Sequence, residues 1–550
     1  MNEVIQVQPD TARTIERLWA LQKMNLGPLG YYAALTLDSD PILAVGGANI
    51  LLEQETIPDL ALDRIIELSV HQSVQLRAFD YFLERYDHAR ARRVLDTPIE
   101  ETPAIIKRLL TATYFQDFDV LYEVEIAGFY RTGTPESLAK AALAAESTGG
   151  WKAALPLLVS LILVKPQDAI TALRLGRLLR DANQFQLLRR FCEIVDTIEI
   201  FPTVSALFRA ALLAKDGQFA EGLKLLDKIA AKKFALEMDV YYFNMRAELQ
   251  EKLGRPEAAY QSYLRQNKIA HDTDFHPQRF AEGVKARAKL SLPPPPPDPR
   301  THDFLMLGFA RSGTTLLDNV LSSHPNIETL EEIPSLTAAV QLYRTTVGAG
   351  LPMPVDFVAR SRARYYEEID RRKKKTGATI FVDKNPMASA DAAFLRKIFL
   401  DKRYIFSIRH PFDVVLSCLK QPFNRNIAMD NFTTFDDSCA CYDMTMTQWF
   451  SQFDLRSPEV FYLRYDTLVL DMKAEVTRVL RFLGTDWVDD VANFAERAEE
   501  RKVKTPSYAK VRQGMSIGVQ SSWRKYEFLF KTRQARLLDR WVAHFGYEGL

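Results

Sequence analysis

The stretch FLMLGFARSGTT, residues 304–315, decides the fold of the C-terminal half of the chain. Its first four residues form an apolar run that predicts a short buried strand. Gly308 and Gly313 bound the turn that follows, and the leucines after the turn lie on one face of an expected helix. The N–H groups at such a helix start lack acceptors, and the helix dipole favours an anion there. The stretch therefore predicts a site for an anion such as a phosphate group.

The spacing of this turn matches the phosphate-binding loop GxxxxGK[ST] with one departure, because Thr314 stands in place of the lysine. In nucleotide-hydrolysing enzymes that lysine reaches the β- and γ-phosphates, so its loss argues against ATP or GTP hydrolysis. Arg311 brings a positive charge to the turn instead, which suits a shorter anion. The alternative is a plain strand-to-helix turn whose glycines serve geometry alone.

Three other apolar runs predict further strands, at residues 379–382, 402–408 and 460–465. Arg409 ends the second of these strands, and Ser417 follows eight residues later on an expected helix. A planar guanidinium binds two phosphate oxygens at once, and a hydroxyl adds another donor, so this pair suits a second anion. A surface ion pair is the alternative for a strand-end arginine taken alone.

Three motifs in this order, RSGTTL at 311–316, SHP at 323–325 and Glu331-Glu332, resemble those of sulfotransferases that use 3′-phosphoadenosine 5′-phosphosulfate (PAPS). They look most like the branch that includes the tyrosylprotein sulfotransferases, and the resemblance runs from about residue 304 to residue 547. It implies a P-loop-like α/β three-layer domain with a parallel sheet, PAPS as co-substrate and no metal. It also implies a hydroxyl acceptor, for which this branch suggests peptidyl tyrosine.

The resemblance also implies which residues bind the donor. Arg409 and Ser417 would grip its 3′-phosphate, and Tyr465 would lie near the adenine. Arg512 and Ser521 fall in late segments that look like those folding over the nucleotide. The full set of expected donor-binding residues is Arg311, Ser312, Gly313, Thr314, Thr315, Arg409, Ser417, Tyr465, Arg512 and Ser521.

The sequence departs from this branch at two expected donor contacts. Four residues after Ser417 the branch often has an arginine, and here Gln421 stands there with Lys420 beside it. Which of these two side chains helps is left open. Ser522 stands where the branch often has a lysine, so that contact is in doubt.

The catalytic residues implied by the resemblance are Glu332, Arg311 and Lys384. Lys384 would contact the transferring sulfuryl group. Glu332 would be the base, because a hydroxyl must lose its proton while it attacks sulfur and a nearby carboxylate can take it. Glu331 becomes the base if the register slips by one residue. Other sulfotransferase branches use a histidine base, for which His324 is the weaker candidate here.

The N-terminal half predicts an array of helical hairpins. Trp151, Phe185 and Phe219 are spaced 34 residues apart, and each follows a small or turn-forming residue and opens an amphipathic helix. This pattern resembles tetratricopeptide repeats, which are helix pairs of that length. Stacked hairpins form a curved solenoid. Its surface would hold a peptide or protein partner, or alternatively serve only as a packing platform.

Five consecutive prolines, 293–297, separate the two halves. We therefore predict a helical repeat domain at 1–290, a proline-rich linker at 291–300 and a sulfotransferase domain at 301–550. Lys plus Arg total 71 and Asp plus Glu total 70, and a net charge of +1 provides no field that calls for nucleic acid or an anionic membrane. The four cysteines are expected to be buried thiols.

The N-terminus lacks the apolar core of a signal peptide, and no stretch of 18 apolar residues occurs, so we expect a cytoplasmic protein without a membrane span. A homodimer is left open. The predicted function is transfer of a sulfuryl group from PAPS to a hydroxyl. Two alternatives stand beside it: an interaction scaffold whose catalytic half is degenerate, and, less favoured, a nucleotide kinase.

Overall fold

The structure is a computed structural model, and its description covers most of the chain. The described residues are 33, 36–37, 41–54, 57, 59–70, 72–85, 87, 90–91, 93–94, 118–165, 168–197, 201–229, 236–270, 276–298, 300–348, 353–423, 426–492, 494 and 521–550. Contacts divide the chain into two compact units, residues 1–124 with 334–372 and residues 125–333 with 373–550. The second unit includes residues 291–300, where the sequence predicts a boundary between domains. That boundary stays a prediction.

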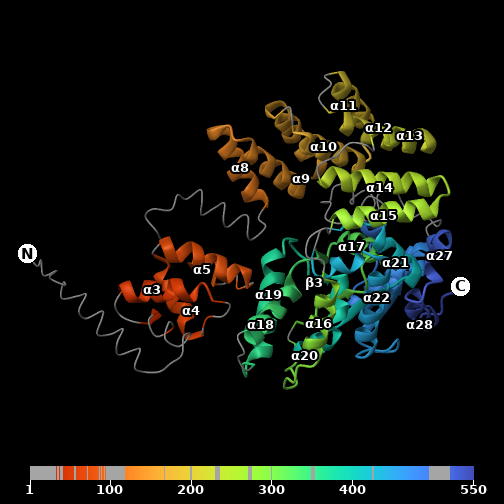
Figure 1. The fold of residues 1–550 in the computed structure, drawn as a ribbon. Coiled ribbons are helices and arrows are strands. Elements are labelled where there is room, and N and C mark those ends of the chain that lie inside the picture. Colours follow the sequence, from red (N-terminus) through yellow and green to blue (C-terminus); the bar gives the residue numbers. More distant parts are fainter. Residues whose placement is uncertain are drawn as a thin grey trace, which may run out of the picture. The chain divides into compact units, whose positions relative to one another are not determined.

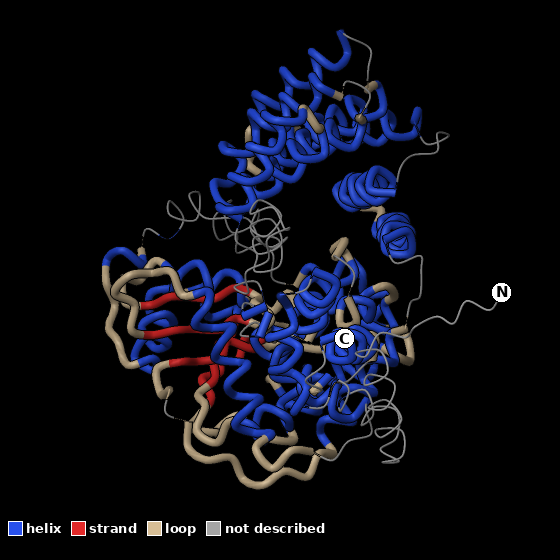
Figure 2. The backbone as a smooth tube through the Cα atoms, turned by 90° about the vertical axis from the view of Figure 1, so that its left-hand side faces the viewer, coloured by secondary structure: helices blue, strands red, loops and turns tan. Residues whose placement is uncertain are grey.

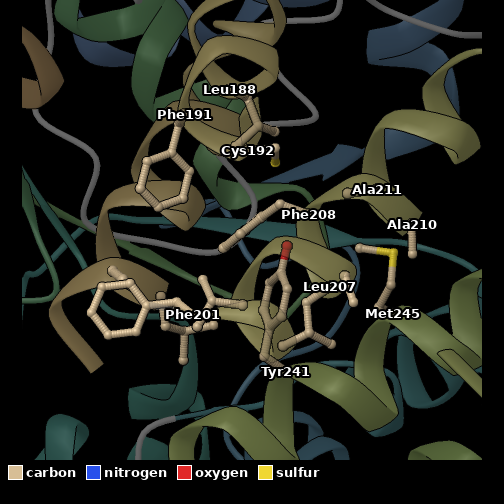
Figure 3. Packing of buried hydrophobic residues seen from close by; sticks show 14 of the residues in the cluster. Leu188, Phe191, Cys192, Phe201, Leu207, Phe208, Ala210, Ala211, Tyr241 and Met245 are labelled. Atoms are coloured by element: carbon tan, nitrogen blue, oxygen red, sulfur yellow. The ribbon is translucent and has the colours of Figure 1, made fainter. Parts of the chain in front are cut away.

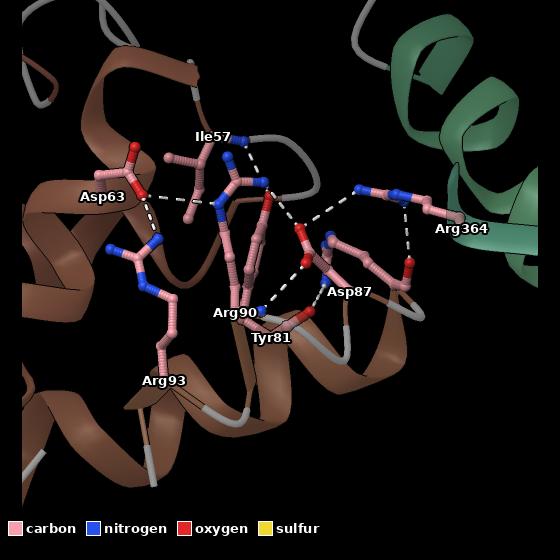
Figure 4. A network of polar contacts seen from close by, with 8 residues as sticks. Ile57, Asp63, Tyr81, Asp87, Arg90, Arg93 and Arg364 are labelled. Atoms are coloured by element: carbon pink, nitrogen blue, oxygen red, sulfur yellow. Dashed lines mark hydrogen bonds and ion pairs between the residues drawn. The ribbon is translucent and has the colours of Figure 1, made fainter. Parts of the chain in front are cut away.

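The first unit is helical and is built from two separate stretches of chain. Its helices (Figure 1) are α3 (Pro41–Leu51), α4 (Asp59–Glu67), the short η1 (Leu68–Val70), α5 (Gln72–Glu84), α18 (Ser335–Gly348) and α19 (Phe357–Arg372). A polar network joins α19 to the N-terminal helices (Figure 4). In it, Arg364 donates to the carbonyl of Arg85 at 3.1 Å and pairs with Asp87, which also accepts from Arg90 at 2.8 Å.

The second unit begins with a row of antiparallel helices. Its members are α8 (Phe118–Thr132), which straddles the unit boundary, then α9 (Pro135–Val164), α10 (Ala169–Asp181), α11 (Phe185–Thr197), α12 (Pro202–Lys215), α13 (Phe219–Ile229), α14 (Leu236–Lys252), α15 (Pro256–Ala270) and α16 (Pro277–Ala288). We call α9 to α16 the helical part.

Residues with positive φ mark where successive helices of this part turn back. Asn183 (φ 57°), Gly217 (79°) and Gly254 (70°) separate α10 from α11, α12 from α13 and α14 from α15. Gly150 (66°) interrupts α9 just before Trp151. The predicted helical hairpins are therefore present. Their assignment as tetratricopeptide repeats stays a prediction.

Aromatic rings pack among aliphatic side chains in the core of the helical part (Figure 3). The Phe208 ring lies 5.3 Å from that of Tyr241 and 6.3 Å from that of Phe191. Gly176 on α10 faces Phe208, and a Cβ at this position would come within 2.1 Å of the ring. The two helices approach so closely because glycine leaves room for the phenylalanine.

The C-terminal half contains one sheet of five parallel strands, in the order β2-β3-β1-β4-β5 (Figure 2). The strands are β1 (Asp303–Leu307), β2 (Ile327–Glu331), β3 (Ile380–Lys384), β4 (Tyr404–Ile408) and β5 (Val460–Arg464). This confirms the predicted fold class, helices followed by an α/β domain with a parallel sheet. We call residues 303–333 and 373–550 the α/β part.

Helices cover both faces of the sheet, as expected for three layers. The helices of the α/β part are α17 (Thr314–Ser322), η2 (Pro386–Asp391), α20 (Ala392–Ile398), α21 (Pro411–Leu419), η3 (Met429–Phe432), α22 (Phe435–Phe450), α23 (Tyr465–Leu470), α24 (Met472–Leu483), η4 (Asp489–Val491), η6 (Ser522–Tyr526), α27 (Glu527–Phe530), η7 (Ala535–Leu538) and α28 (Asp539–His544). On one face, α17 and α24 share a core with the strands. On the other, Trp449 of α22 stacks on Phe406 at 4.5 Å.

All four cysteines are buried free thiols, as predicted. Within the part of the chain that the structure describes, no helix combines the length and the apolar character needed to cross a bilayer.

Candidate active site

The residues singled out in the sequence follow the carboxyl ends of the strands. Across the sheet these ends lead to Glu332 after β2, Lys384 at the end of β3, Gly308 after β1, Arg409 after β4 and Tyr465 after β5. In a parallel sheet the carboxyl ends of all strands lie on the same side, which we call the sheet edge, and α/β proteins bind their ligands there. The structure thus gathers motifs from five separate stretches along a single edge.

The loop after β1 turns sharply into α17. Gly313 is the N-cap with φ 102°, and a Cβ there would lie 2.3 Å from the ring of Tyr465. Arg311 has φ 69°, a left-handed conformation that a non-glycine residue seldom adopts. Ser312 is buried, and its carbonyl accepts from the hydroxyl of Ser407 at 2.9 Å. Thr314 and Thr315 form the buried first turn of α17.

The predicted sulfate and 3′-phosphate residues adjoin one another. Arg311 Nε donates to Ser417 Oγ at 3.1 Å, and Arg409 Nη1 donates to the carbonyl of Arg311 at 3.2 Å. Burial lowers the pKa of Arg311, Cys418 opposes this effect, and the positive charge of Arg409 adds a smaller lowering. Both arginines are only partly exposed and their like charges repel, so an anion bound beside them would be stabilising.

On the other side of β1, a buried lysine lies between two carboxylates. Lys384 Nζ is 3.1 Å from Glu331 Oε1 and 3.0 Å from Glu332 Oε1, and its side chain is fully buried. Burial alone would lower the pKa of Lys384, but the carboxylates of Glu331, Glu332 and Asp318 outweigh it and raise the pKa. Lys384 is therefore charged at neutral pH.

Glu331 and Glu332 differ in their surroundings. Glu331 is the last residue of β2, directly opposite Lys384 in the strand register, and its side chain is 14% exposed. Glu332 follows with φ 48°, its N–H donates to the carbonyl of Lys384 at 2.8 Å, and its side chain is 47% exposed. A substrate would reach Glu332 far more readily than Glu331.

His324 lies near the amino ends of the strands, opposite to the end that carries the candidate site. It precedes β2, whereas Glu332 follows that strand. One ring nitrogen lies 3.0 Å from the carbonyl of Asp486, the other accepts from the N–H of Asn326, and the residue is buried. The histidine therefore serves the local structure and is remote from the strand-end residues.

The remaining expected donor contacts lie on the β5 side. Tyr465 packs against the loop glycine, and the guanidinium of Arg409 lies 4.8 Å from its ring centre. The N–H of Ser521 donates to Asp413 in the first turn of α21 at 3.0 Å. Arg512 lies outside the described residues. The binding roles of these three residues stay predictions.

Lys420, a candidate donor contact, forms an ion pair with the helical part. Its ammonium donates to Glu251 of α14 at 2.6 Å and lies 4.2 Å from the ring centre of Tyr526. Burial lowers the pKa of Lys420, and the carboxylate of Glu251 counteracts the effect. Of the two candidates that the sequence left open, Lys420 thus bonds to the helical part.

Two groups of hydrogen bonds that the sequence does not predict stabilise the site. The hydroxyl of Ser389 donates to the carbonyl of Gly308, at the start of the loop. Asp413 accepts from the hydroxyl of Ser522 at 2.8 Å and from the N–H of Trp523 at 3.1 Å. No local pattern marks either contact, because the partners are 81 to 110 residues apart.

Comparison with known proteins finds a matching family model and several curated relatives. The model of the sulfotransferase family matches residues 303–489. An uncharacterized protein of Aquifex aeolicus is 25% identical over 251 residues, which cover 42% of this chain and 31% of that protein. Protein-tyrosine sulfotransferase 1 of Danio rerio is 24% identical over 196 residues, 34% of this chain and 55% of the relative. Protein-tyrosine sulfotransferase 2 of Gallus gallus is 21% identical over 254 residues, 43% and 62% of the two chains.

The chain therefore spans less than two thirds of each of these relatives. The family match begins at β1 and ends beyond α24. It includes the loop after β1 and the strand-end residues Glu332, Lys384, Arg409 and Tyr465. The similarity to sulfotransferases thus coincides with the sheet and with the edge that carries the candidate site.

Proposed function

We propose that the chain transfers a sulfuryl group from PAPS to a hydroxyl acceptor and releases adenosine 3′,5′-bisphosphate. The observation that carries the proposal is the arrangement at the sheet edge. Arg311, Ser417 and Arg409, which we propose to bind an anion, adjoin one another on one side of the β1 loop, and Lys384 with its two carboxylates lies on the other. The match to the sulfotransferase family supports the same reading.

The residues present suit such a donor. Arg311 and the N–H groups at the start of α17 would hold its 5′-phosphosulfate end, because that helix start favours negative charge. Arg409 and Ser417 would hold the 3′-phosphate. PAPS supplies an activated sulfuryl group on a phosphate that leaves readily. In this proposal the two arginines serve the two anionic ends of the donor, Arg311 the 5′-phosphosulfate and Arg409 the 3′-phosphate.

On the acceptor side, Glu332 takes the proton of the hydroxyl while its oxygen attacks sulfur. One oxygen–sulfur bond forms as the bond between sulfur and the leaving phosphate breaks. Lys384 has three N–H donors, two of which face Glu331 and Glu332 among the described residues. Its charge stabilises the sulfuryl oxygens in the transition state, and Glu331 holds it in position.

Peptidyl tyrosine is the acceptor we propose, supported by the similarity to two protein-tyrosine sulfotransferases. Free tyrosine has a pKa near 10, so a base matters for this acceptor. A mixture of tyrosine-containing peptides and a matched mixture with phenylalanine in place of tyrosine would test it. We expect a gain of sulfate, measured by mass spectrometry, in the first mixture alone.

The base is tested by two neighbouring substitutions. Glu332→Gln should lower kcat by about 10²- to 10⁴-fold and leave the affinity for adenosine 3′,5′-bisphosphate unchanged. Glu331→Gln is the matched control, with a smaller loss. Equal activity of Glu332→Gln and the wild-type protein would exclude Glu332 as the base. If the wild-type protein neither transfers sulfate nor binds the nucleotide, the alternative of an interaction scaffold with a degenerate catalytic half would be favoured.

A further inference from the structure

Helix α21 of the α/β part carries Ser417, and its last carbonyls need partners from outside the helix. The N–H of Lys420 donates to the carbonyl of Leu416 at 3.2 Å, and the N–H of Gln421 donates to the carbonyl of Cys418 at 3.0 Å. The carbonyl of Leu419 accepts instead from Asn267 Nδ2 of α15 at 2.8 Å. A side chain of the helical part thus completes the end of the helix.

Asn267 reaches a second element of the α/β part. The same amide nitrogen lies 3.2 Å from the carbonyl of Phe432, the last residue of η3. Asn267 is only 1% exposed. Both acceptors are backbone carbonyls, so the site demands an N–H₂ donor and would reject a carboxylate.

The orientation of this amide is set by a chain of carboxamides within the helical part. Asn244 of α14 donates to Gln266 Oε1 at 2.7 Å, and Gln266 donates to Asn267 Oδ1 at 2.9 Å. A buried hydrogen-bond chain whose members are all satisfied holds its groups in one arrangement. Asn267 therefore points its donors at α21 as a consequence of how α14 and α15 pack.

A second contact lies one residue along. The ammonium of Lys420 pairs with Glu251 at 2.6 Å, and the hydroxyl of Tyr263 donates to the other oxygen of that carboxylate at 3.2 Å. At its opposite end α21 is held by Asp413, which accepts from Ser521, Ser522 and Trp523. The carboxyl end of α21 is thus held by the helical part, and the amino end by the C-terminal segment.

From these contacts we infer that Asn267 is a positioning residue for the 3′-phosphate, and that the helical part is a structural component of the nucleotide site. Ser417 is two residues before Leu419, and its hydroxyl meets Arg311 at 3.1 Å. A hydrogen bond weakens steeply when its geometry changes, so a small displacement of α21 would be felt there. The inference rests on the proposed function, in which Ser417 and Arg409 bind that phosphate.

The test compares two ligands on the full chain by calorimetry: adenosine 3′,5′-bisphosphate, and adenosine 5′-monophosphate, which lacks the 3′-phosphate. Asn267→Asp keeps the shape but turns the donor into an acceptor, and we expect it to reduce the preference for the bisphosphate at least tenfold. Asn267→Ala removes the donor without adding charge and should give a smaller reduction. If circular dichroism shows that Asn267→Asp does not fold, Asn267→Ala takes its place in the test.

Ser262→Ala is the matched control, because its buried hydroxyl donates to Gln250 at 2.7 Å between the same two helices. It should lower the melting temperature and leave the ligand preference unchanged. A folded Asn267→Ala variant that keeps the wild-type preference, within twofold, would overturn the inference, as would an equal loss in Ser262→Ala. If the wild-type chain itself shows no preference for the bisphosphate, the proposed function fails instead.

Discussion

Arg311 and Arg409 lie beside each other after β1 and β4, and a bound anion would offset the repulsion between their positive charges. Their side chains and backbone adjoin through Ser417 Oγ and the Arg311 carbonyl. Residues held this way at a ligand site commonly trade stability for binding. We therefore propose that an anionic ligand binds beside these two arginines.

Replacing Arg409 tests this reading. Arg409→Lys keeps the charge but loses the planar, two-pronged donor that matches a phosphate. Losing a charge-assisted hydrogen bond costs about 1.5–3 kcal/mol, which is roughly a 10- to 150-fold weaker Kd for adenosine 3′,5′-bisphosphate. Calorimetry measures this directly. An unchanged Kd would show that Arg409 binds no phosphate.

Replacing Lys384 tests the other side of the site. Lys384→Met leaves Glu331 and Glu332 without their shared counter-charge, and breaking a buried pair costs about 3–5 kcal/mol. We expect the lower end of this range because Glu332 is half exposed. Urea unfolding at pH 7 measures the loss, with Lys397→Met as a partly exposed control.

The pH dependence of this loss follows from the pKa of Lys384. The folded-state pKa of Lys384 is raised, so its stabilisation is complete below the unfolded value near 10.4 and disappears only as the pH rises through the folded value. The stability gap between the two proteins should therefore be the same at pH 7 and at pH 9, because Lys384 of the wild-type protein stays charged at both values. A gap that narrows between pH 7 and pH 9 would contradict the ion-pair account.

At the scale of elements, the close packing of α10 on α12 makes a separate prediction. Gly176→Ala would place a Cβ 2.1 Å from the Phe208 ring and should destabilise the chain by about 1–3 kcal/mol. Phe208→Leu removes the ring, so the same glycine substitution should cost less in that background. A double-mutant cycle in urea measures the coupling. Additive effects would mean that the two helices are not in close contact.

Four of the five strands could be predicted because apolar and aromatic residues dominate each of them. β2, with the sequence IETLE, was missed because its Glu328 and Thr329 are polar although they are buried. It is an edge strand, and the N–H of Lys374 donates to Glu328 Oε1 at 2.7 Å. Partners that far apart in the sequence leave no local signal. Local patterns predicted the loop after β1 for the opposite reason, since its strand, glycines and helix are contiguous.

At the scale of the whole molecule, the contacts of the helical part show what a motif search does not detect. Arg287 of α16 makes a buried bidentate ion pair with Asp391 of η2, at 2.7 and 3.0 Å. Together with Asn267 and Lys420, it joins residues more than 100 positions apart. The proline run therefore separates two kinds of sequence without separating the helical part from the sheet. Only the folded chain reveals this, because each partner taken alone is an ordinary polar residue.

The most direct test of the central claim is calorimetry of the wild-type chain with adenosine 3′,5′-bisphosphate, beside adenosine 5′-monophosphate and MgATP. We predict one site that prefers the bisphosphate at least about tenfold over either of the others, a difference of ~1.4 kcal/mol. Arg409→Ala should abolish that preference. No binding of the bisphosphate, or tighter binding of MgATP, would contradict the account.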